Sequence, residues 1–131
     1  MLISNKLISL LTAFSKHELN SFNKFLNSPF HNENQDLIKL FYIIDSYLRS
    51  SEKEQRENPL EKEKVWKAIY PKKTYKDVRL RRICSDLIKL GYSFLAHTNY
   101  QKKHLSEQLS LLAALSRPDL QKHFENSFGQ V

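Results

Sequence analysis

Six of the seven cations between positions 72 and 89 are spaced so that they could bind an anionic ligand together. They are Lys72, Lys73, Lys76, Arg79, Arg82 and Lys89. On a helix, Arg79, Arg82 and Lys89 share the face opposite a leucine stripe, and the three lysines lie at its start. Long cations held on such a face can reach phosphate oxygens and guanine edges. The spacing predicts a candidate nucleic-acid-binding surface of the helix-turn-helix type.

The positive charge of the chain is concentrated in the same region. Residues 64–103 hold eleven Lys and Arg against two Asp, a net charge of +9, so the rest of this +7 chain carries −2. A basic segment on a near-neutral body is typical of a protein with an anionic partner. The alternative is a solvated helix face that happens to be rich in Lys and Arg, and the sequence leaves both open.

The other reactive side chains do not form a catalytic pattern. Cys84 follows Ile83 on an apolar stripe, which favours a small buried hydrophobe over a nucleophile. No two of the five histidines are spaced i, i+4 on one helix, so a zinc site is not predicted. Two isolated glycines cannot build a phosphate cradle. We therefore expect no enzyme activity, no metal and no cofactor.

Composition predicts an all-α fold. A chain of 131 residues with 40% apolar residues suits a single domain, residues 1–131, with a core of its own. Two Gly and four Pro provide too few turns for sheets. One cysteine indicates a reducing compartment, so we expect a cytoplasmic protein, and no apolar run is long enough to cross a membrane.

Apolar periodicity predicts a compact orthogonal bundle of about six to seven helices, with a helix-turn-helix-like pair in the middle. The expected subdivisions are 1–50, the basic pair 58–100 and 104–131. The expected helices lie at about 2–13, 16–28, 35–52, 59–70, 75–100 and 105–115, with a seventh beginning at 116–119.

Several local signals place the helix ends. Ser15 and Glu18 form a capping box, and Asn34 is a candidate N-cap. Gly91 lies on the apolar stripe of the basic helix, where it permits close helix approach or marks a bend. The charged segment 50–57 has no apolar residue and is predicted to be a mobile connector.

The fourth helix begins with Asn58 as N-cap and Pro59 at its first position. Within it, Trp66 lies beside apolar neighbours and is predicted to pack in the core. Phe30 follows Pro29 in a loop and is predicted to plug the helical body, because an exposed loop phenylalanine needs a reason.

Part of the basic pair resembles a known DNA-binding family. The matching runs are Glu63–Pro71, which contains Trp66, and Val78–Leu90. They resemble the core of winged-helix effector domains of bacterial transcriptional activators, which place a Trp-containing helix before a recognition helix. The resemblance implies DNA binding by the second run. The family carries a β-hairpin wing after that helix, whereas residues 91–96 here continue the helical stripe.

A broader resemblance covers nearly the whole chain. It rests on the Leu10–Asn32 run, with its Phe14-Ser15 and Ser28-Pro29-Phe30 steps, on the Lys64-Val65-Trp66 helix and on the Leu80–Leu95 helix. Together these are similar to the N-terminal region of a family of large uncharacterised all-helical proteins from Bacteroidetes-type bacteria. The resemblance implies a longer parent protein and supplies no activity.

Two functions are therefore expected. The first is a helical interaction or scaffolding domain that packs against a protein partner or the remainder of a longer chain. The second is a nucleic-acid-binding helix-turn-helix module of a transcriptional regulator, acting through the 72–89 basic face.

Overall fold

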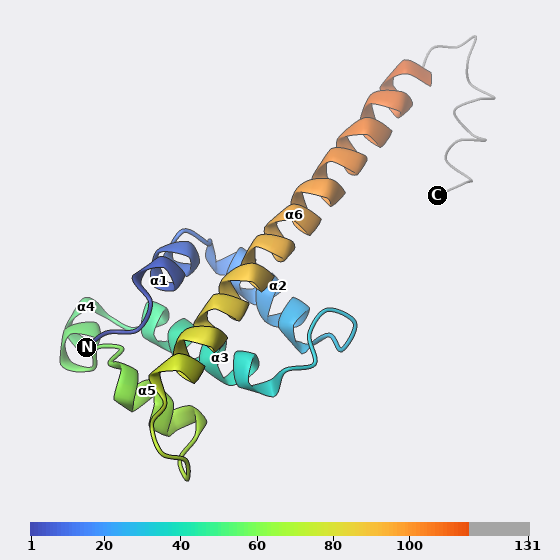
Figure 1. The fold of residues 1–131 in the computed structure, drawn as a ribbon. Helices are drawn as coiled ribbons and strands as arrows, with labels where there is room; N and C mark the ends of the chain where they lie inside the picture. The colour runs from blue at the N-terminus through green and yellow to red at the C-terminus, as the bar shows by residue number, and fades with distance from the viewer. Residues whose placement is uncertain (116–131) are drawn as a thin grey trace. The chain divides into compact units, whose positions relative to one another are not determined.

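The computed structural model describes residues 1–115, and the surroundings of side chains as far as residue 112. The described residues contain six helices and no strand, so the predicted all-α bundle is confirmed (Figure 1). The seventh predicted helix lies outside the described residues. The chain divides into two units, Met1–Phe94 and Leu95–Val131. The helices are α1 (Asn5–Thr12), α2 (Lys16–Asn27), α3 (Gln35–Arg49), α4 (Glu52–Glu57), α5 (Lys62–Ile69) and α6 (Asp77–Leu115).

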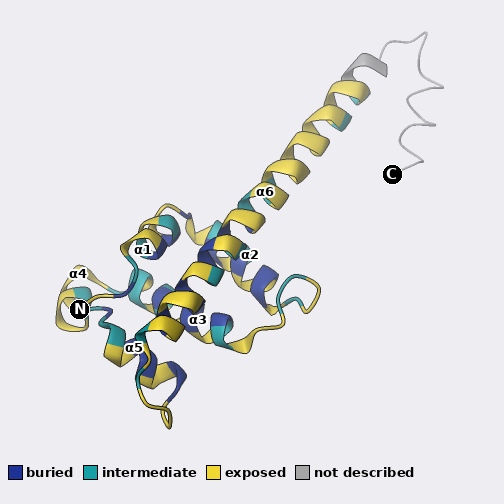
Figure 2. Cartoon of the chain, in the orientation of Figure 1, coloured by how far each residue is buried: buried dark blue, intermediate teal, exposed yellow. Residues whose placement is uncertain are grey.

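Helix α3 is the centre of the first unit. It packs against both α2 and α5. Its Leu40 and Ile44 are fully buried, and Leu37 and Phe41 are nearly so (Figure 2). These four residues are spaced i, i+3, i+4 and i+7, so they form one buried face, whereas Tyr42 on another face is 70% exposed.

A cluster of phenylalanines joins three helices of this core and the corner between α1 and α2. Phe22 of α2 has no exposed surface. Its ring centroid lies 5.2 Å from those of Phe41 and Phe94 and 5.7 Å from that of Phe14. Such edge and tilted contacts add to the free energy gained by burying the rings. The cluster holds α2, α3 and the middle of α6 around one centre.

The short-range signals for helix ends are confirmed. The Ser15 hydroxyl accepts from the Glu18 amide at 3.1 Å, and the Glu18 carboxylate accepts from the Ser15 amide at 2.9 Å. The Asn34 side chain accepts from the Asp36 amide at 3.0 Å. Helix α2 ends at Asn27, and Ser28, before Pro29, is extended. These bonds involve residues within four positions of each other, which is why the sequence alone locates them.

The starts of α1 and α5 differ from the prediction. Helix α1 begins at Asn5, with Ser4 as N-cap, and Leu2 before it forms an isolated β-bridge with Glu61. The Ile3 amide donates to the Leu60 carbonyl at 2.9 Å, and the Lys62 amide donates to the Met1 carbonyl at 2.8 Å. Leu60 is buried where this long-range pairing occurs, and it is not part of a helix. Helix α5 therefore begins at Lys62, and the predicted start at Pro59 is wrong.

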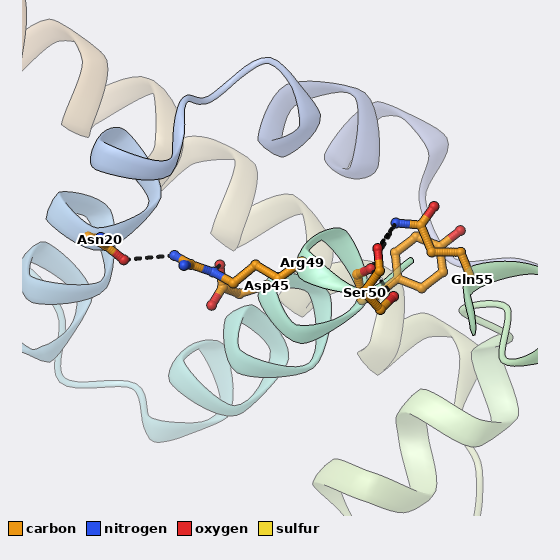
Figure 3. Close-up of polar contacts among 6 residues, drawn as sticks. Asn20, Asp45, Arg49, Ser50 and Gln55 are labelled. Carbon is orange, nitrogen blue, oxygen red and sulfur yellow. Dashed lines mark hydrogen bonds and ion pairs between the residues drawn. The ribbon is translucent and has the colours of Figure 1, made fainter. Parts of the chain in front are cut away.

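The predicted connector 50–57 is also wrong, because Glu52–Glu57 forms α4. The Ser51 hydroxyl caps it by accepting from the Glu54 amide at 3.2 Å. Helix α4 has no buried residue, and the Gln55 side chain holds it to the end of α3 by donating to the Tyr47 carbonyl at 2.9 Å (Figure 3). Helix α3 consequently ends at Arg49 instead of near position 52.

The same end of α3 is fastened to α2 by polar side chains. Arg49 pairs with Asp45 at 2.9 Å and donates to the Asn20 side chain at 2.7 Å (Figure 3). All three groups lie at the surface, so they contribute little stability each. They fix the register of α2 against α3 beside the phenylalanine cluster.

Phe30 does not plug the body, and that prediction is wrong: its side chain is 91% exposed. The amides of His31 and Asn32 both donate to the Ser28 carbonyl, at 3.0 and 2.9 Å, in a tight turn. The turn leaves Phe30 outside and brings the His31 ring onto Phe25, with centroids 4.1 Å apart. His31 therefore packs against the helical body at the place where the sequence predicts Phe30.

The predicted fifth and sixth helices are one helix, α6. The expected break near residues 101–104 is absent because Gln-Lys-Lys-His contains no Gly or Pro and each residue tolerates a helix. Gly91 marks a close approach. A Cβ built there would lie 2.9 Å from Cδ2 of Leu10 on α1. Of the two roles proposed for this glycine, the structure supports contact between helices.

Candidate interaction surfaces

The loop between α5 and α6 is built around Tyr70. Its hydroxyl donates to the Asp36 carboxylate at 2.5 Å, and the Arg79 guanidinium lies 4.0 Å from the same oxygen. The Arg79 guanidinium carbon is 4.9 Å from the Tyr70 ring centroid, within cation–π range. Burial first, and then the hydrogen bond to Asp36, raise the pKa of Tyr70. These contacts join α3, α5 and α6 at one point.

The tryptophan of α5 anchors the same loop. Trp66 is 2% exposed, so its predicted place in the core is confirmed. Its ring lies 4.4 Å from that of Tyr70, and its Nε1–H donates to the Lys73 carbonyl at 3.0 Å. The polar edge of the indole therefore fixes the loop while its rings fill the core.

The six predicted cations fall into three environments. Arg79 and Lys73 lie over the Tyr70 ring, the Lys73 ammonium at 5.2 Å, so both have structural contacts. Lys72, Lys76 and Arg82 are exposed, and no carboxylate within the described chain pairs with them. Lys89 is also exposed, but it lines a different hollow from the other five. The six predicted cations therefore do not form one continuous basic surface.

The α5–α6 pair departs from a helix-turn-helix in its connection. A helix-turn-helix joins its two helices by three or four residues. Here residues 70–76 separate Ile69 from Asp77. After the predicted recognition residues, the described chain continues as helix as far as Leu115, without a strand that could form a wing. The connection of this pair is therefore longer than that of a helix-turn-helix, and the described residues after it contain no wing strand.

Asp77 at the start of α6 holds two cations. The Lys62 ammonium and the Arg81 guanidinium each lie 2.9 Å from one of its oxygens. The Tyr75 hydroxyl donates to it at 2.8 Å. The hydrogen bond from Lys62, followed by that from Tyr75, lowers the pKa of Asp77. Burial first, and then the bond to Asp77, raise the pKa of Tyr75 to about 12.

A hollow of about 1030 Å³ lies between the N-terminal segment and the first turns of α6. We call it the α1/α6 groove. Its residues along α6 run from Leu80 to Tyr92, and its opposite wall is residues 1–8, with Tyr47, Leu60 and Lys62 completing it. The lining is mostly apolar, as in ligand and peptide sites. Leu2 and Tyr92 expose about half of their surface, 59% and 49%.

The charged residues that line the α1/α6 groove all have one sign. They are Lys6, Lys62, Arg81 and Lys89, and the lining contains no Asp or Glu. Asp77, outside the lining, pairs with Lys62 and Arg81, which leaves Lys6 and Lys89 without a carboxylate partner among the described residues. The rim of the groove is therefore electropositive.

Cys84 lies in the lining of this groove and is 3% exposed, so its predicted burial is confirmed. Burial raises the pKa of its thiol, outweighing a backbone hydrogen bond at Ser4 and the charge of Lys62. A buried, protonated thiol packs as a small hydrophobe and is a poor nucleophile. It contributes apolar surface to the groove.

The second unit carries an apolar stripe that is exposed. Leu105 and Leu109 stand one helical turn apart on α6 and are 55% and 58% exposed. Leu112 follows at the next helical spacing. Periodicity predicts burial for these leucines, which is wrong for Leu105 and Leu109. The sequence shows the stripe, but not that the other described residues leave Leu105 and Leu109 exposed.

The described residues contain no group of three or more His, Cys, Asp or Glu side chains that could hold a metal ion. In the same part of the chain, no helix combines the length and apolar composition that a membrane crossing requires. Comparison with known proteins finds no matching protein-family model, curated protein or solved structure. Any proposal about function therefore rests on the surfaces described above.

Proposed function

We propose that this chain is a non-enzymatic helical interaction domain, and that a partner helix covers the Leu105–Leu112 stripe of α6. The observation that carries the proposal is the exposure of Leu105 and Leu109 by more than half. Leucines spaced i, i+4, i+7 form the seam along which a second helix packs. The partner would come from another protein or from a longer parent chain.

Removing the exposed leucine side chains from water would favour the binding of a partner helix. Full burial of a leucine side chain contributes about 1.5–3 kcal/mol, so covering the exposed half of Leu105 and Leu109 would contribute roughly 2–3 kcal/mol in total. Contacts of a partner helix on both sides of the stripe would add to this. Large apolar side chains that recur along one face of a helix gain no free energy from contact with water. Their exposure therefore favours an interaction role for this face.

The test is a pair of matched double variants. Leu105→Glu with Leu109→Glu places two charges on the stripe, whereas Ser106→Glu with Ser110→Glu places the same charges on a neighbouring face of the helix. Chemical cross-linking in the native cells, read by mass spectrometry, should give discrete adducts for the natural chain and the serine variant. The leucine variant should lose them.

Two results would contradict the proposal. One is a natural chain that forms no discrete adduct and sediments as a monomer at every concentration tested. The other is equal loss of adducts from both double variants, because that would indicate a general effect of charge and not of the stripe. A cytoplasmic location belongs to the same proposal, and fluorescence microscopy of the tagged chain would test it.

Nucleic-acid binding is a second candidate function. The observation that favours it is that Lys72, Lys76 and Arg82 are exposed and unpaired within the described residues. Three free cations at one helix start can contact phosphates without reading sequence. Such contacts release counterions, so affinity for duplex DNA would fall steeply with salt.

For this candidate, replacing Lys72, Lys76 and Arg82 by Ala is compared with a control that removes three cations elsewhere. Lys24 and Lys53 are exposed on α2 and α4, and Lys16 starts α2. If DNA binds at the predicted face, the first variant reduces the slope of log affinity against log salt by about 2–3, since each phosphate contact contributes about 0.9. Equal slopes for both variants, or no binding, would exclude a localised site.

A further inference from the structure

We propose that the α1/α6 groove is the binding site of an acidic amphipathic helix from a partner protein. This surface lies in the first unit and involves none of the stripe residues Leu105–Leu112, so the inference stands independently of the function proposed above. It rests on three features of the groove: its dimensions, the sign of its charges and its exposed apolar side chains.

The dimensions match one face of a helix. From Leu80 to Tyr92 the groove follows α6 for about 18 Å, at 1.5 Å per residue, which is the length of three helical turns. Its volume of about 1030 Å³ lies at the upper end of the range of small-molecule pockets, about 300–1,000 Å³, which favours a larger occupant such as one face of a helix.

The positive charges at the rim of the groove favour a negatively charged occupant. Lys89 stands on the α6 side of the groove and Lys6 on the α1 side, and no carboxylate of the described chain pairs with either. A helix lying between them can present Asp or Glu at both edges of its apolar face. The same rim repels Lys and Arg, so it discriminates by repulsion as well as attraction.

The charges also argue against a second copy of this chain as the occupant. The exposed leucine stripe of α6 is the apolar helix that a second copy would offer. In the helical turn before Leu105 this segment carries Lys102 and Lys103. Glu107 is the one acidic residue beside the described part of the stripe. That segment has the wrong sign for a groove bordered by lysines, whereas an acidic helix has the right one.

The apolar anchors of the groove are already at the surface. Leu2 and Tyr92 are exposed at its edges, and Ile88 lies in its lining between them. In helix-in-groove recognition, apolar side chains at i, i+3, i+4 and i+7 of the peptide enter such a lining. Tyrosine at the edge adds a large contact with few rotamers to immobilise, which is typical of residues that dominate binding.

The experiment is a selection with a display library of three-turn helices. All members share an apolar face, and the flanking positions are randomised among Asp, Glu, Lys, Arg, Ser and Gln. Selection on the natural chain should enrich Asp and Glu beside the apolar face. Selection on a chain with Lys6→Glu and Lys89→Glu should lose that enrichment or reverse it towards Lys and Arg.

The affinity of a selected peptide then tests the site. Tyr92→Ala should weaken binding about tenfold, whereas Tyr42→Ala, which truncates a more exposed tyrosine of α3 outside the groove, should leave it unchanged. The Lys6→Glu and Lys89→Glu pair should weaken binding at least about fivefold, and more at low salt. Circular dichroism of each variant confirms that the fold is kept, since all these side chains are exposed.

Three outcomes would overturn the proposal. The first is a selection without charge preference, or with a preference that survives the lysine reversals. The second is equal loss of affinity from Tyr92→Ala and Tyr42→Ala. The third is a groove that binds laurate, detected by the same Tyr92 dependence, while no library member binds, which would assign it to an anionic amphiphile. The function proposed for the Leu105–Leu112 stripe is tested separately, by cross-linking of the Leu105 and Leu109 variants. Failure of one proposal can therefore be distinguished from failure of the other.

Discussion

Gly91→Val tests the close approach of α1 to α6. Valine is a better helix former than glycine, so at an open position the change would stabilise the helix by a few tenths of a kcal/mol. At Gly91, however, even the Cβ would lie 2.9 Å from the end of the Leu10 side chain, and valine adds two methyl groups beyond it. Leu10 is half-buried, and Cδ2 is the free end of a side chain that can shift, so the cost lies at the low end of the range of about 1–3 kcal/mol that is typical of overpacking. The expected net loss is therefore about 0.5–1 kcal/mol.

A double-mutant cycle assigns that loss to Leu10. Leu10→Ala removes the side-chain atoms that the new methyl groups would meet, so the double variant should be more stable than the sum of the single effects predicts. The coupling expected for residues in contact is about 0.5–3 kcal/mol. Ser93→Val, an exposed position two residues further along α6, controls for the effect of valine on the helix.

The assay is urea denaturation read by two signals. Far-UV circular dichroism reports all helices, and the fluorescence of Trp66, the one tryptophan of the chain, reports the packing of α5. Coincident transitions would justify a two-state free energy. A Gly91→Val chain as stable as the natural one, or additive effects of Leu10→Ala and Gly91→Val, would refute the close approach.

Three further predictions concern the α5–α6 connection. Arg79→Ala should lower the free energy of unfolding by about 0.5–1 kcal/mol through loss of its stacking and ion pair, whereas Arg82→Ala should change it by less than about 0.5 kcal/mol; equal effects would contradict the assigned contacts. Trp66→Phe should cost about 1.5–3 kcal/mol by thermal or urea denaturation, mainly because the core loses volume and also because the part-buried Lys73 carbonyl loses its donor; a cost below about 0.5 kcal/mol would contradict it. Asp77→Asn should lower Tm near neutral pH, and the difference from the natural chain should shrink as the pH falls through and below 3.8. Its folded pKa is depressed, so the charge stabilises above the ordinary pKa and this contribution is lost on protonation. A Tm difference that does not change with pH would exclude the ion pairs as its cause.

The charge pattern of the sequence located the cations but did not determine their roles. The sequence places Arg79 with Arg82 on one helical face as equivalent contacts. In the structure Arg79 packs on Tyr70 and approaches Asp36, which is distant in sequence. A helical period assigns a face, but only a neighbouring element decides whether a cation on that face is already occupied.

The misassigned segments have different physical causes. Phe30 is left outside by a local turn, in which His31 packs against Phe25, six residues before it. Position 59 does not start a helix because Leu60 pairs with the N-terminal segment, which is distant in sequence. Only in the second case did a tertiary contact override a local preference.

The features that could be predicted from the sequence are local: the all-α class, the capping box at Ser15, the N-cap Asn34, the burial of Trp66 and the special place of Gly91. Each depends on a helical period or on groups within a few residues, so the chain carries that information directly. Three features became visible only in the folded chain. The 1–4 and 60–62 segments pair, α6 borders a groove with cations on its rim, and Leu105 and Leu109 are exposed among the described residues. Periodicity identifies an apolar face, but whether another element covers that face depends on contacts between residues far apart in the chain.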